Sequence, residues 1–339
     1  MNQLVSIVIP CLNEGNYIDS CIRSVINSDY TKDSLMVFIS DGGSTDNTLD
    51  IVKGYVKNHS FIHLLNNENK TTPYALNLGI EQSADADVII ILGAHAEIYP
   101  DYISQCIKRL NSDSSIGCVG GVLENISEDE KTKAISLAMS SLFGVGNAHF
   151  RTGSYEGYVD TVAFGAYRNN VFKHCGNFDT ELTRNQDDEF NYRITKAGYK
   201  IFLSKDIRSR YFVRSSFTKL FKQYFQYGYW KVYVNRKHQT VTTFRQLIPS
   251  CMVLFLVFGI FISMVWETTR PYFYLVSLLY LFLSFVSALI KSRRPLEVHK
   301  IMSAFFILHM AYGIGYLKGV IDFVILNRVN SNKFVKLTR

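Results

Sequence analysis

The chain has 339 residues, of which 47% are apolar and 19% are charged, and its formal net charge is +7. The charged fraction lies below the roughly 25% of soluble proteins, which argues against an ordinary water-soluble protein, and the many apolar residues exclude a disordered chain. Residues 1–204 contain 16 Lys or Arg and 25 Asp or Glu (net −9), residues 205–245 contain 10 and 1 (net +9), and residues 246–339 contain 10 and 3 (net +7). We therefore expect an acidic head, a basic neck and an apolar, basic tail.

In the first hundred residues, short apolar runs alternate with segments of helical periodicity. The strand-like runs are residues 5–10, 35–40, 61–65 and 88–92, and the helical segments are residues 18–26, a helix capped by Ser44 or Thr45, and residues 73–82. This alternation predicts an α/β fold, with a mostly parallel sheet and helices on both faces. Right-handed crossovers then place the loops after the strands at one edge, where open α/β sheets bind ligands.

Three loops are expected at that edge: residues 10–14, 41–46 and 93–97. None contains the GxGxxG or GxxxxGK[ST] pattern, which disfavours a dinucleotide oxidoreductase and a P-loop nucleotidase. Asp41 ends a strand and is followed by two glycines, so its carboxylate could accept a hydrogen bond from an imide or a ribose hydroxyl. The alternative is that Asp41 and Asp46 only stabilise a turn and a helix start.

The N-terminus lacks the basic and apolar segments of a signal peptide, so we expect the head to stay in the cytoplasm. The six cysteines show no CxxC spacing, which indicates reduced, inert thiols and argues against a zinc site.

An acidic segment further on, NQDDEFNYRITKAGYK, is typical of a helix. Asn185 can cap it, Glu189 and Arg193 are spaced for an i, i+4 ion pair, and Gly198 can end it. Its three adjacent carboxylates point about 100° apart, so only one can face a reaction centre. The alternative is an acidic helix start that complements the helix dipole.

Residues 205–245 interleave basic and aromatic residues, and within them we assign residues 216–245 to the neck as a domain. One helical face carries Phe217, Leu220, Phe221, Tyr224 and Phe225. This composition could bind nucleic acid, but the apolar segments that follow favour an interfacial helix on a membrane with anionic lipid.

Two charge-free apolar runs follow, Leu247–Trp266 and Tyr272–Ile290, each long enough to cross a membrane as a helix. The basic segments that flank this hairpin predict that both of its ends are cytoplasmic. A third run, Ile301–Leu317, can cross, re-enter or lie in the interface, and the basic tail favours the last two. The expected domains are a head at 1–215, the neck, a membrane region at 246–326 and a tail at 327–339.

Four motifs, VSIVIPCLNE, SDGGSTDNT, ALNLGI and DDEFNYRITKAGYKI, resemble the family 2 glycosyltransferases over roughly residues 4–215. The segments ILGAHAEIYPDYI and LFKQYFQYGYWKVY resemble most closely the branch with the succinoglycan-type exopolysaccharide glucosyltransferases. The resemblance implies a GT-A fold and an inverting reaction that uses a nucleotide-diphosphate sugar.

The resemblance also implies roles for particular residues. Those in the nucleotide-sugar site would be Pro10, Asn13, Glu14, Asp41, Lys70, Asn77 and Gly93, with Asp41 binding the base. Asp187 would be the catalytic base, and its acidic neighbours would raise its proton affinity. The alternative for Asn77 is a role in helix packing.

The expected metal motif departs from the family pattern. Relatives have Asp-x-Asp or Asp-Ala-His after the fourth strand, whereas this chain has Gly93-Ala94-His95. His95 remains as a metal ligand, better for Mn²⁺ than for Mg²⁺, and Glu97 could compensate for the missing carboxylate. We therefore expect a weakened divalent-cation site, and a catalytically inactive homologue remains an alternative.

These features predict an inverting, non-processive glycosyltransferase at the plasma (inner) membrane, with a cytoplasmic catalytic domain. The expected donor is a UDP-hexose, and the expected acceptor is a lipid-linked saccharide of cell-surface polysaccharide synthesis, with polysaccharide assembly proteins as further partners and no nucleic acid. A Gln-x-x-Arg-Trp motif of processive members is absent, because Gln223 and Trp230 are wrongly spaced. The alternatives are a polyprenyl-phosphate sugar synthase and an inactive membrane scaffold.

Overall fold

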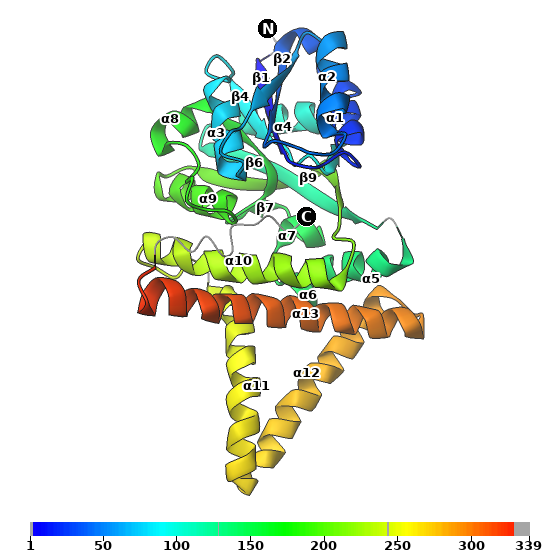
Figure 1. The fold of residues 1–339 in the computed structure, drawn as a ribbon, viewed down its shortest axis with the longest axis vertical. Helices are drawn as coiled ribbons and strands as arrows, with labels where there is room; N and C mark the ends of the chain where they lie inside the picture. Colours follow the sequence, from blue (N-terminus) through cyan, green and yellow to red (C-terminus); the bar gives the residue numbers. More distant parts are fainter. Residues whose placement is uncertain (1–2, 128, 243, 329–339) are drawn as a thin grey trace. The chain divides into compact units, whose positions relative to one another are not determined.

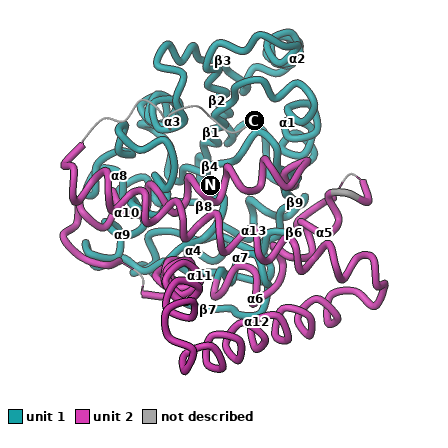
Figure 2. The backbone as a smooth tube through the Cα atoms, turned by 60° about the horizontal axis from the view of Figure 1, so that its bottom comes forward, with its two compact units in different colours: residues 1–124, 148–212 teal, residues 125–147, 213–339 magenta. Residues whose placement is uncertain are grey.

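The computed structural model describes residues 3–127, 129–242 and 244–328 (Figure 1). The chain forms two compact units, coloured separately in Figure 2. Unit 1 contains Met1–Glu124 and Ala148–Phe212, and unit 2 contains Asn125–Asn147 and Val213–Arg339. The sequence analysis assigned all of residues 1–215 to the head, whereas the structure groups the segment 125–147 with the C-terminal part. Most of the predicted tail, residues 329–339, lies outside the described residues.

Within its described residues, unit 1 is built on a nine-stranded sheet with the order β3-β2-β1-β4-β8-β6-β9-β5, and β7 pairs with β9. The strands are β1 Val5–Cys11, β2 Leu35–Asp41, β3 Ile62–Asn66, β4 Val88–Ile91, β5 Ala96–Ile98, β6 Ile116–Ile126, β7 Gly157–Tyr158, β8 Ala163–Arg168 and β9 Lys200–Phe212. The first four strands in this order are parallel, while β8 runs antiparallel to β4. The predicted α/β fold is confirmed, with a sheet that becomes mixed beyond β4.

Successive residues of β1 are buried in two different clusters, one on each face of the sheet. Val5, Ile7 and Ile9 belong to one cluster and Val8 to the other. A strand that is covered on both faces needs an apolar residue at nearly every position, which is why its sequence is a continuous apolar run. The α-helices of unit 1 are α1 Ile18–Ile26, α2 Thr48–Asn58, α3 Thr72–Glu81, α4 Tyr102–Ser112, α7 His149–Thr152, α8 Asn169–Cys175 and α9 Gln186–Lys196.

One predicted helix start is wrong. Helix α2 begins at Thr48 with Asn47 as its N-cap residue, rather than at Ser44 or Thr45. The reason is that Ser44 donates its hydroxyl hydrogen to the Asp41 carboxylate, and that hydrogen bond holds it in the preceding turn.

Unit 2 is helical in its described part. Its elements are α5 Glu130–Met139, α6 Leu142–Val145, α10 Phe217–Lys237, α11 Ile248–Val265, α12 Arg270–Lys291, α13 Pro295–Gly319 and a π-helical turn at Val320–Ile325. Helices α10 and α13 lie side by side, and α11 and α12 run crosswise to this pair and converge at their far ends (Figure 1).

The segment 125–147 packs onto the C-terminal helices of unit 2. The Phe143 ring lies edge-on to the Phe305 ring, with centroids 5.0 Å apart, and also contacts the Tyr280 ring at 5.6 Å. Lys133 forms an ion pair with Glu297 at 2.7 Å. These contacts join α5 and α6 to α12 and α13, although they are more than a hundred residues apart in sequence.

Three apolar helical segments of unit 2 are long enough to cross a membrane: Phe244–Val265, Glu267–Lys291 and Pro295–Ile325. Of the residues in the most apolar stretch of each segment, only 17% and 11% are buried in the first two segments, compared with 44% in the third. Exposed apolar surface of this extent is typical of a membrane-contacting or partner-contacting segment. The α11–α12 hairpin is therefore largely exposed, whereas α13 is more buried because it packs against α10.

The contact between α10 and α13 depends on glycines that let the two backbones approach each other. A Cβ atom at Gly228 would lie 2.0 Å from the Tyr312 carbonyl oxygen, and one at Gly315 would lie 2.1 Å from the Phe225 carbonyl oxygen. Close backbone approach through small residues is a common way to pack apolar helices in membranes.

We expect Gly228→Ala to destabilise unit 2, because the added methyl group forces the two helices apart, at a cost of about 1–3 kcal/mol. The matched control is Gly54→Ala in α2, where a Cβ atom would meet nothing within 4 Å. That substitution should stabilise the chain by about 0.5–1 kcal/mol, because alanine is the better helix former. Thermal unfolding in detergent measures both, and equal midpoints would contradict the proposed role of Gly228.

Candidate active site

The loops that follow β1 and β2 are joined through Asn13. Its backbone N–H donates to the Ser44 hydroxyl at 2.8 Å, and its side-chain oxygen accepts from the Thr45 backbone N–H at 2.8 Å. Asn13 has a φ of +55°, in the left-handed region that only glycine and, less often, Asn adopt easily. The two loops therefore form one connected structure at the carboxyl end of the parallel strands.

Asp46 and Thr48 hold the backbone on either side of Glu14. The Glu14 N–H donates to the Thr48 hydroxyl at 2.8 Å, and the Gly15 N–H donates to the Asp46 carboxylate at 3.0 Å. Burial alone would raise the pKa of Asp46, but hydrogen bonds from Thr48 and Gly15 hold it below its ordinary value. Asp46 thus acts in the structure as a loop-fixing carboxylate, one of the two interpretations that the sequence left open.

Asp41 is 3% exposed, and its carboxylate accepts hydrogen bonds within its own turn. The donors include the Gly43 backbone N–H at 2.8 Å and the Ser44 backbone N–H at 3.0 Å. The Cys11 thiol also lies 3.6 Å from this carboxylate, and burial followed by the charge of Asp41 raises the pKa of Cys11 far above its ordinary value. These contacts show that Asp41 shapes the turn, while its contact with a base stays a prediction.

Lys70 lies beside the two glycines that follow Asp41. A Cβ atom at Gly42 would be 3.3 Å from the Lys70 carbonyl oxygen, and one at Gly43 would be 3.8 Å from Lys70 Cε. Lys70 has a φ of +60°, and its side chain is exposed. The structure thus brings an exposed ammonium group to the loop of Asp41, as required for the predicted contact with a nucleotide-sugar.

The side chains of Glu14 and His95 come together from the loops after β1 and β4. Glu14 Oε1 lies 3.7 Å from His95 Nδ1, and the two side chains are 7% and 18% exposed. The His95 ring packs against the Tyr211 ring, with centroids 4.9 Å apart. The backbone carbonyl oxygen of His95 accepts a hydrogen bond from the Phe212 N–H at 3.3 Å. The sequence assigned these two residues to separate roles, whereas the structure places them side by side.

The space beside Gly93 is filled by an aromatic ring. A Cβ atom at position 93 would lie 2.9 Å from Phe164 Cε1. Phe164 has a φ of +49°, which is rare for a bulky side chain, and its carbonyl oxygen accepts from the Tyr102 hydroxyl. The chain therefore lacks both the carboxylate at position 93 and the room for it.

We expect Gly93→Asp alone to lose about 1–3 kcal/mol of stability and to gain no affinity for Mn²⁺, because the Phe164 ring blocks the new side chain. Adding Phe164→Gly should remove the clash, relieve the positive φ and strengthen Mn²⁺ binding in the presence of UDP. The Phe164→Gly single variant is the control, and calorimetry measures binding. Tight Mn²⁺ binding by Gly93→Asp alone would contradict this interpretation.

Asp187 is an exposed residue in the first turn of α9. The predicted helix is confirmed, as are the Glu189–Arg193 ion pair at 2.8 Å and Gly198 at its end. The predicted capping by Asn185 is wrong in part: this residue is the N-cap but has a φ of +62°, and its side chain makes no capping hydrogen bond to the described residues of α9.

The charge of Asp187 acts on Tyr167 of β8, a buried tyrosine. The Tyr167 ring lies over Gly165, towards the start of β8 and the end of β4, and its hydroxyl is 3.5 Å from the side-chain oxygen of Asn191. Burial, with added effects of the Cys118 thiol and the Asp187 charge, raises the pKa of Tyr167 well above its ordinary value. Asp187 is therefore an exposed carboxylate whose charge contributes to the raised pKa of a buried phenol.

Asn77 and Pro10 have local structural roles. The Asn77 side chain pairs with the Phe178 backbone, donating to its carbonyl oxygen and accepting from its N–H, both at 2.9 Å. This contact matches the helix-packing alternative and ties α3 to the segment before α9. Pro10 lies in β1 beyond Val8, the last residue that pairs with β4, so its missing N–H costs no ladder hydrogen bond on that side.

Arg151 is a candidate residue that the sequence analysis did not single out. It lies in α7, and its guanidinium stacks over the Tyr211 ring, 5.2 Å from the centroid. The same ring contacts His95, so Arg151 brings a positive charge close to the Glu14–His95 pair. No sequence motif signals this placement, because it depends on the pairing of β9 with β5.

The described residues contain no group of three or more His, Cys, Asp or Glu side chains that could hold a metal ion by themselves. The Glu14–His95 pair offers one carboxylate and one imidazole, a donor set that suits Mn²⁺ better than Mg²⁺. A divalent cation at this place would need the oxygen atoms of a bound diphosphate and water to complete its ligands.

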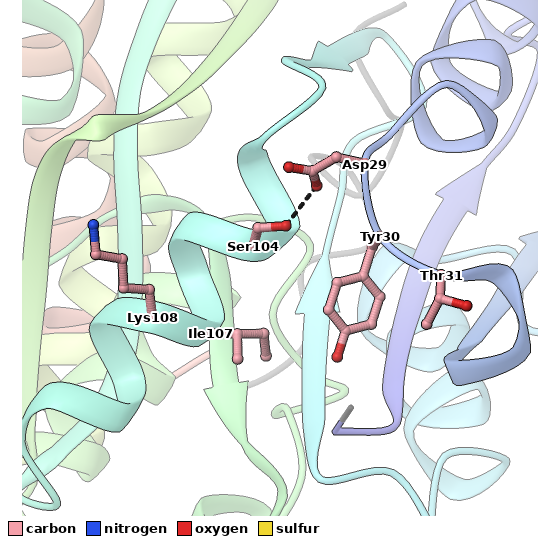
Figure 3. Close-up of a pocket in the computed structure, with 6 residues that line it drawn as sticks. All are labelled: Asp29, Tyr30, Thr31, Ser104, Ile107 and Lys108. Atoms are coloured by element: carbon pink, nitrogen blue, oxygen red, sulfur yellow. Dashed lines mark hydrogen bonds between the residues drawn. The ribbon is translucent and has the colours of Figure 1, made fainter. Parts of the chain in front are cut away.

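Unit 1 also has a pocket that none of these loops lines, and Figure 3 shows its lining residues. It is lined by Asp29, Tyr30 and Thr31, before β2 begins, and by residues of α4, and the Ser104 hydroxyl donates to Asp29 at 2.5 Å. Because the candidate residues follow the carboxyl ends of β1, β2 and β4, this pocket at the amino end of β2 is separate from them.

Comparison with known proteins identifies the family. Residues 6–176, about half of the chain, match the family model described as glycosyl transferase family 2. The chain belongs to glycosyl transferase family 2. As a member of this family it is an enzyme, a glycosyltransferase, and the predicted family and enzyme class are confirmed.

Two curated relatives of this family 2 glycosyltransferase match over most of their length. A Methanococcus voltae protein, dolichyl N-acetyl-alpha-D-glucosaminyl phosphate 3-beta-D-2,3-diacetamido-2,3-dideoxy-beta-D-glucuronosyltransferase, is 32% identical over 325 residues, covering 94% of this chain and 97% of the relative. The succinoglycan biosynthesis protein ExoA of Rhizobium meliloti is 29% identical over 267 residues, covering 78% and 80%. The predicted likeness to the succinoglycan branch is confirmed.

Among solved structures, the mannosyltransferase PcManGT of Pyrobaculum calidifontis, in complex with GDP-Man and Mn²⁺, has a TM-score of 0.67. It is 15% identical, and the match covers 95% of this chain and 88% of that protein. This likeness shows the fold alone and confirms the predicted GT-A architecture. The C-terminal apolar helices are seen in this chain itself.

Proposed function

We propose that this glycosyltransferase transfers a sugar, with inversion, from a UDP-hexose to a lipid-linked saccharide at the cytoplasmic face of the plasma membrane. The observation that carries this proposal is the Methanococcus relative, which matches along almost its whole length and is named for a dolichyl-phosphate-linked acceptor sugar. The exposed apolar hairpin supports it, because α11 and α12 would anchor the enzyme where such an acceptor is found.

The chemistry requires one base and a stabilised leaving group. Asp187 would accept the proton of the acceptor hydroxyl. At the same time the acceptor hydroxyl oxygen would bond to C1 of the sugar, and the bond from C1 to the diphosphate would break. Lys70 and Arg151 would neutralise charge on the departing nucleotide diphosphate. A divalent cation, when bound at Glu14 and His95, would supply further positive charge to the same diphosphate.

The placement of α13 favours two membrane crossings over three. Within unit 2, α13 runs alongside α10 and crosswise to the hairpin, and a larger share of it is buried. We propose that α10 and α13 lie along the membrane interface, with the exposed basic residues of α10, such as Lys219 and Lys222, facing anionic lipid. Such a chain has too few spans to line a translocation channel, which favours single addition.

The test is a transfer assay with the purified full chain in lipid nanodiscs. A panel of nucleotide-sugars is offered with two acceptors, a polyprenyl-linked saccharide and a polyprenyl phosphate. We expect product only with the lipid-linked saccharide and a UDP-sugar. Product with the bare lipid phosphate would instead indicate a polyprenyl-phosphate sugar synthase, and failure of transfer with every pair would contradict the proposed function.

A further inference from the structure

The carboxylates of the loops after β1, β2 and β4 make different contacts. Glu97 forms an ion pair with Arg210 at 3.5 Å, and the Asp41 and Asp46 carboxylates accept hydrogen bonds from their own turns. Glu14 Oε1 lies 3.7 Å from the imidazole nitrogen Nδ1 of His95.

This distance is longer than a direct hydrogen bond, whose donor and acceptor lie about 2.7–3.2 Å apart. Two ligand atoms at right angles on one cation, with bonds of about 2.1 Å, lie roughly 3 Å apart. A small movement of either side chain would therefore let both contact one ion.

The backbone around both residues is firmly held. The Glu14 N–H donates to Thr48, and its carbonyl oxygen accepts from the N–H groups of Tyr17 and Ile18 at 2.8 and 2.9 Å. The loop of His95 is tied to β9 through the Phe212 N–H. Ligands that are positioned before the ion arrives lose little conformational entropy on binding.

We propose that Glu14, from the loop after β1, supplies the carboxylate that the loop after β4 lacks, so that Glu14 and His95 together hold the divalent cation. This inference rests on the proposed function, because the remaining ligands come from the donor diphosphate. Two protein ligands make a weak site for the ion alone, so Mn²⁺ and the nucleotide diphosphate bind together.

The test measures Mn²⁺ binding rather than turnover. The full chain in detergent is titrated with Mn²⁺, with and without saturating UDP, and the free ion is followed by electron paramagnetic resonance. We expect Glu14→Gln to weaken Mn²⁺ binding in the presence of UDP by at least about tenfold. Mutating residues that only hydrogen-bond to a metal ligand commonly lowers metal affinity by this factor, so loss of a ligand should lower it at least as much. The matched control, Glu97→Gln, should keep the affinity of the unaltered chain.

A second measurement separates a metal ligand from a nucleotide contact. UDP affinity without metal, in EDTA, should be the same for Glu14→Gln and the unaltered chain, and the nearly isosteric change should leave the thermal midpoint in place. Unchanged Mn²⁺ binding in Glu14→Gln, or weakened binding in Glu97→Gln instead, would overturn the inference. If neither UDP nor GDP binds the unaltered chain, the proposed function itself fails.

Discussion

Replacing Asp187 with asparagine is expected to reduce sugar transfer by about 10²–10⁴-fold, the range that a general base contributes. Asparagine keeps the size and polarity of the side chain but cannot take a proton from the acceptor hydroxyl. Since Asp187 is exposed in the first turn of α9, the change should not unfold the chain. Single-turnover transfer, with UDP affinity measured in parallel, should show lost chemistry and retained nucleotide binding.

The neighbouring residue provides the matched control. Asp188 carries the same charge in the same helical turn, but its side chain points about 100° away from that of Asp187. Asp188→Asn should therefore change transfer only modestly, through the loss of a nearby negative charge. Near-normal turnover of Asp187→Asn, or an equal loss in both variants, would mean that the base lies elsewhere.

The parallel half of the fold could be predicted because its signal is local. Strands β1, β2 and β4 are runs of mostly buried apolar residues, and the helices between the first four strands keep a helical period, so each element is visible within about ten residues. The same holds for the α11–α12 hairpin, which consists of charge-free apolar runs. Connection rules then placed the loops of Asn13, Asp41 and His95 at one edge.

The remaining features depend on contacts between distant parts of the chain. No local pattern shows that the segment 125–147 packs against α13, or that the Phe164 ring occupies the space beside Gly93. The pairing of Glu14 with His95 likewise follows from the adjacency of β1 and β4, and it requires side-chain directions that a sequence does not give. Motifs thus indicated which residues matter, while the partners of those residues came from the structure.

The segment before α9 shows how the fold positions the candidate base. Arg193 donates to the backbone carbonyl oxygens of Cys175 and Asn177, and Asn77 pairs with the backbone of the next residue, Phe178. These bonds tie the end of α8, helix α3 and helix α9 together. The ion pair between Arg193 and Glu189 is thus part of the support for Asp187.

Arg193→Met is expected to lower the free energy of unfolding of unit 1 by about 3–5 kcal/mol, the usual cost of breaking a buried ion pair. Glu189 is 0% exposed and its carboxylate accepts three hydrogen bonds from the guanidinium, so the variant leaves a buried carboxylate without its cation. The variant also loses the two bonds to backbone carbonyl oxygens. The change is measured by denaturant unfolding of the full chain in detergent, monitored by far-ultraviolet circular dichroism.

Two further variants separate the buried pair from a general effect of charge. Lys196→Met removes one positive charge from the exposed side of the same helix and should change stability by less than about 0.5 kcal/mol. Replacing Glu189 and Arg193 together by methionine should recover much of the loss, because no charge is then left buried. If the double variant is as unstable as Arg193→Met, the bonds from Arg193 to the backbone, rather than the ion pair, hold α9 in place.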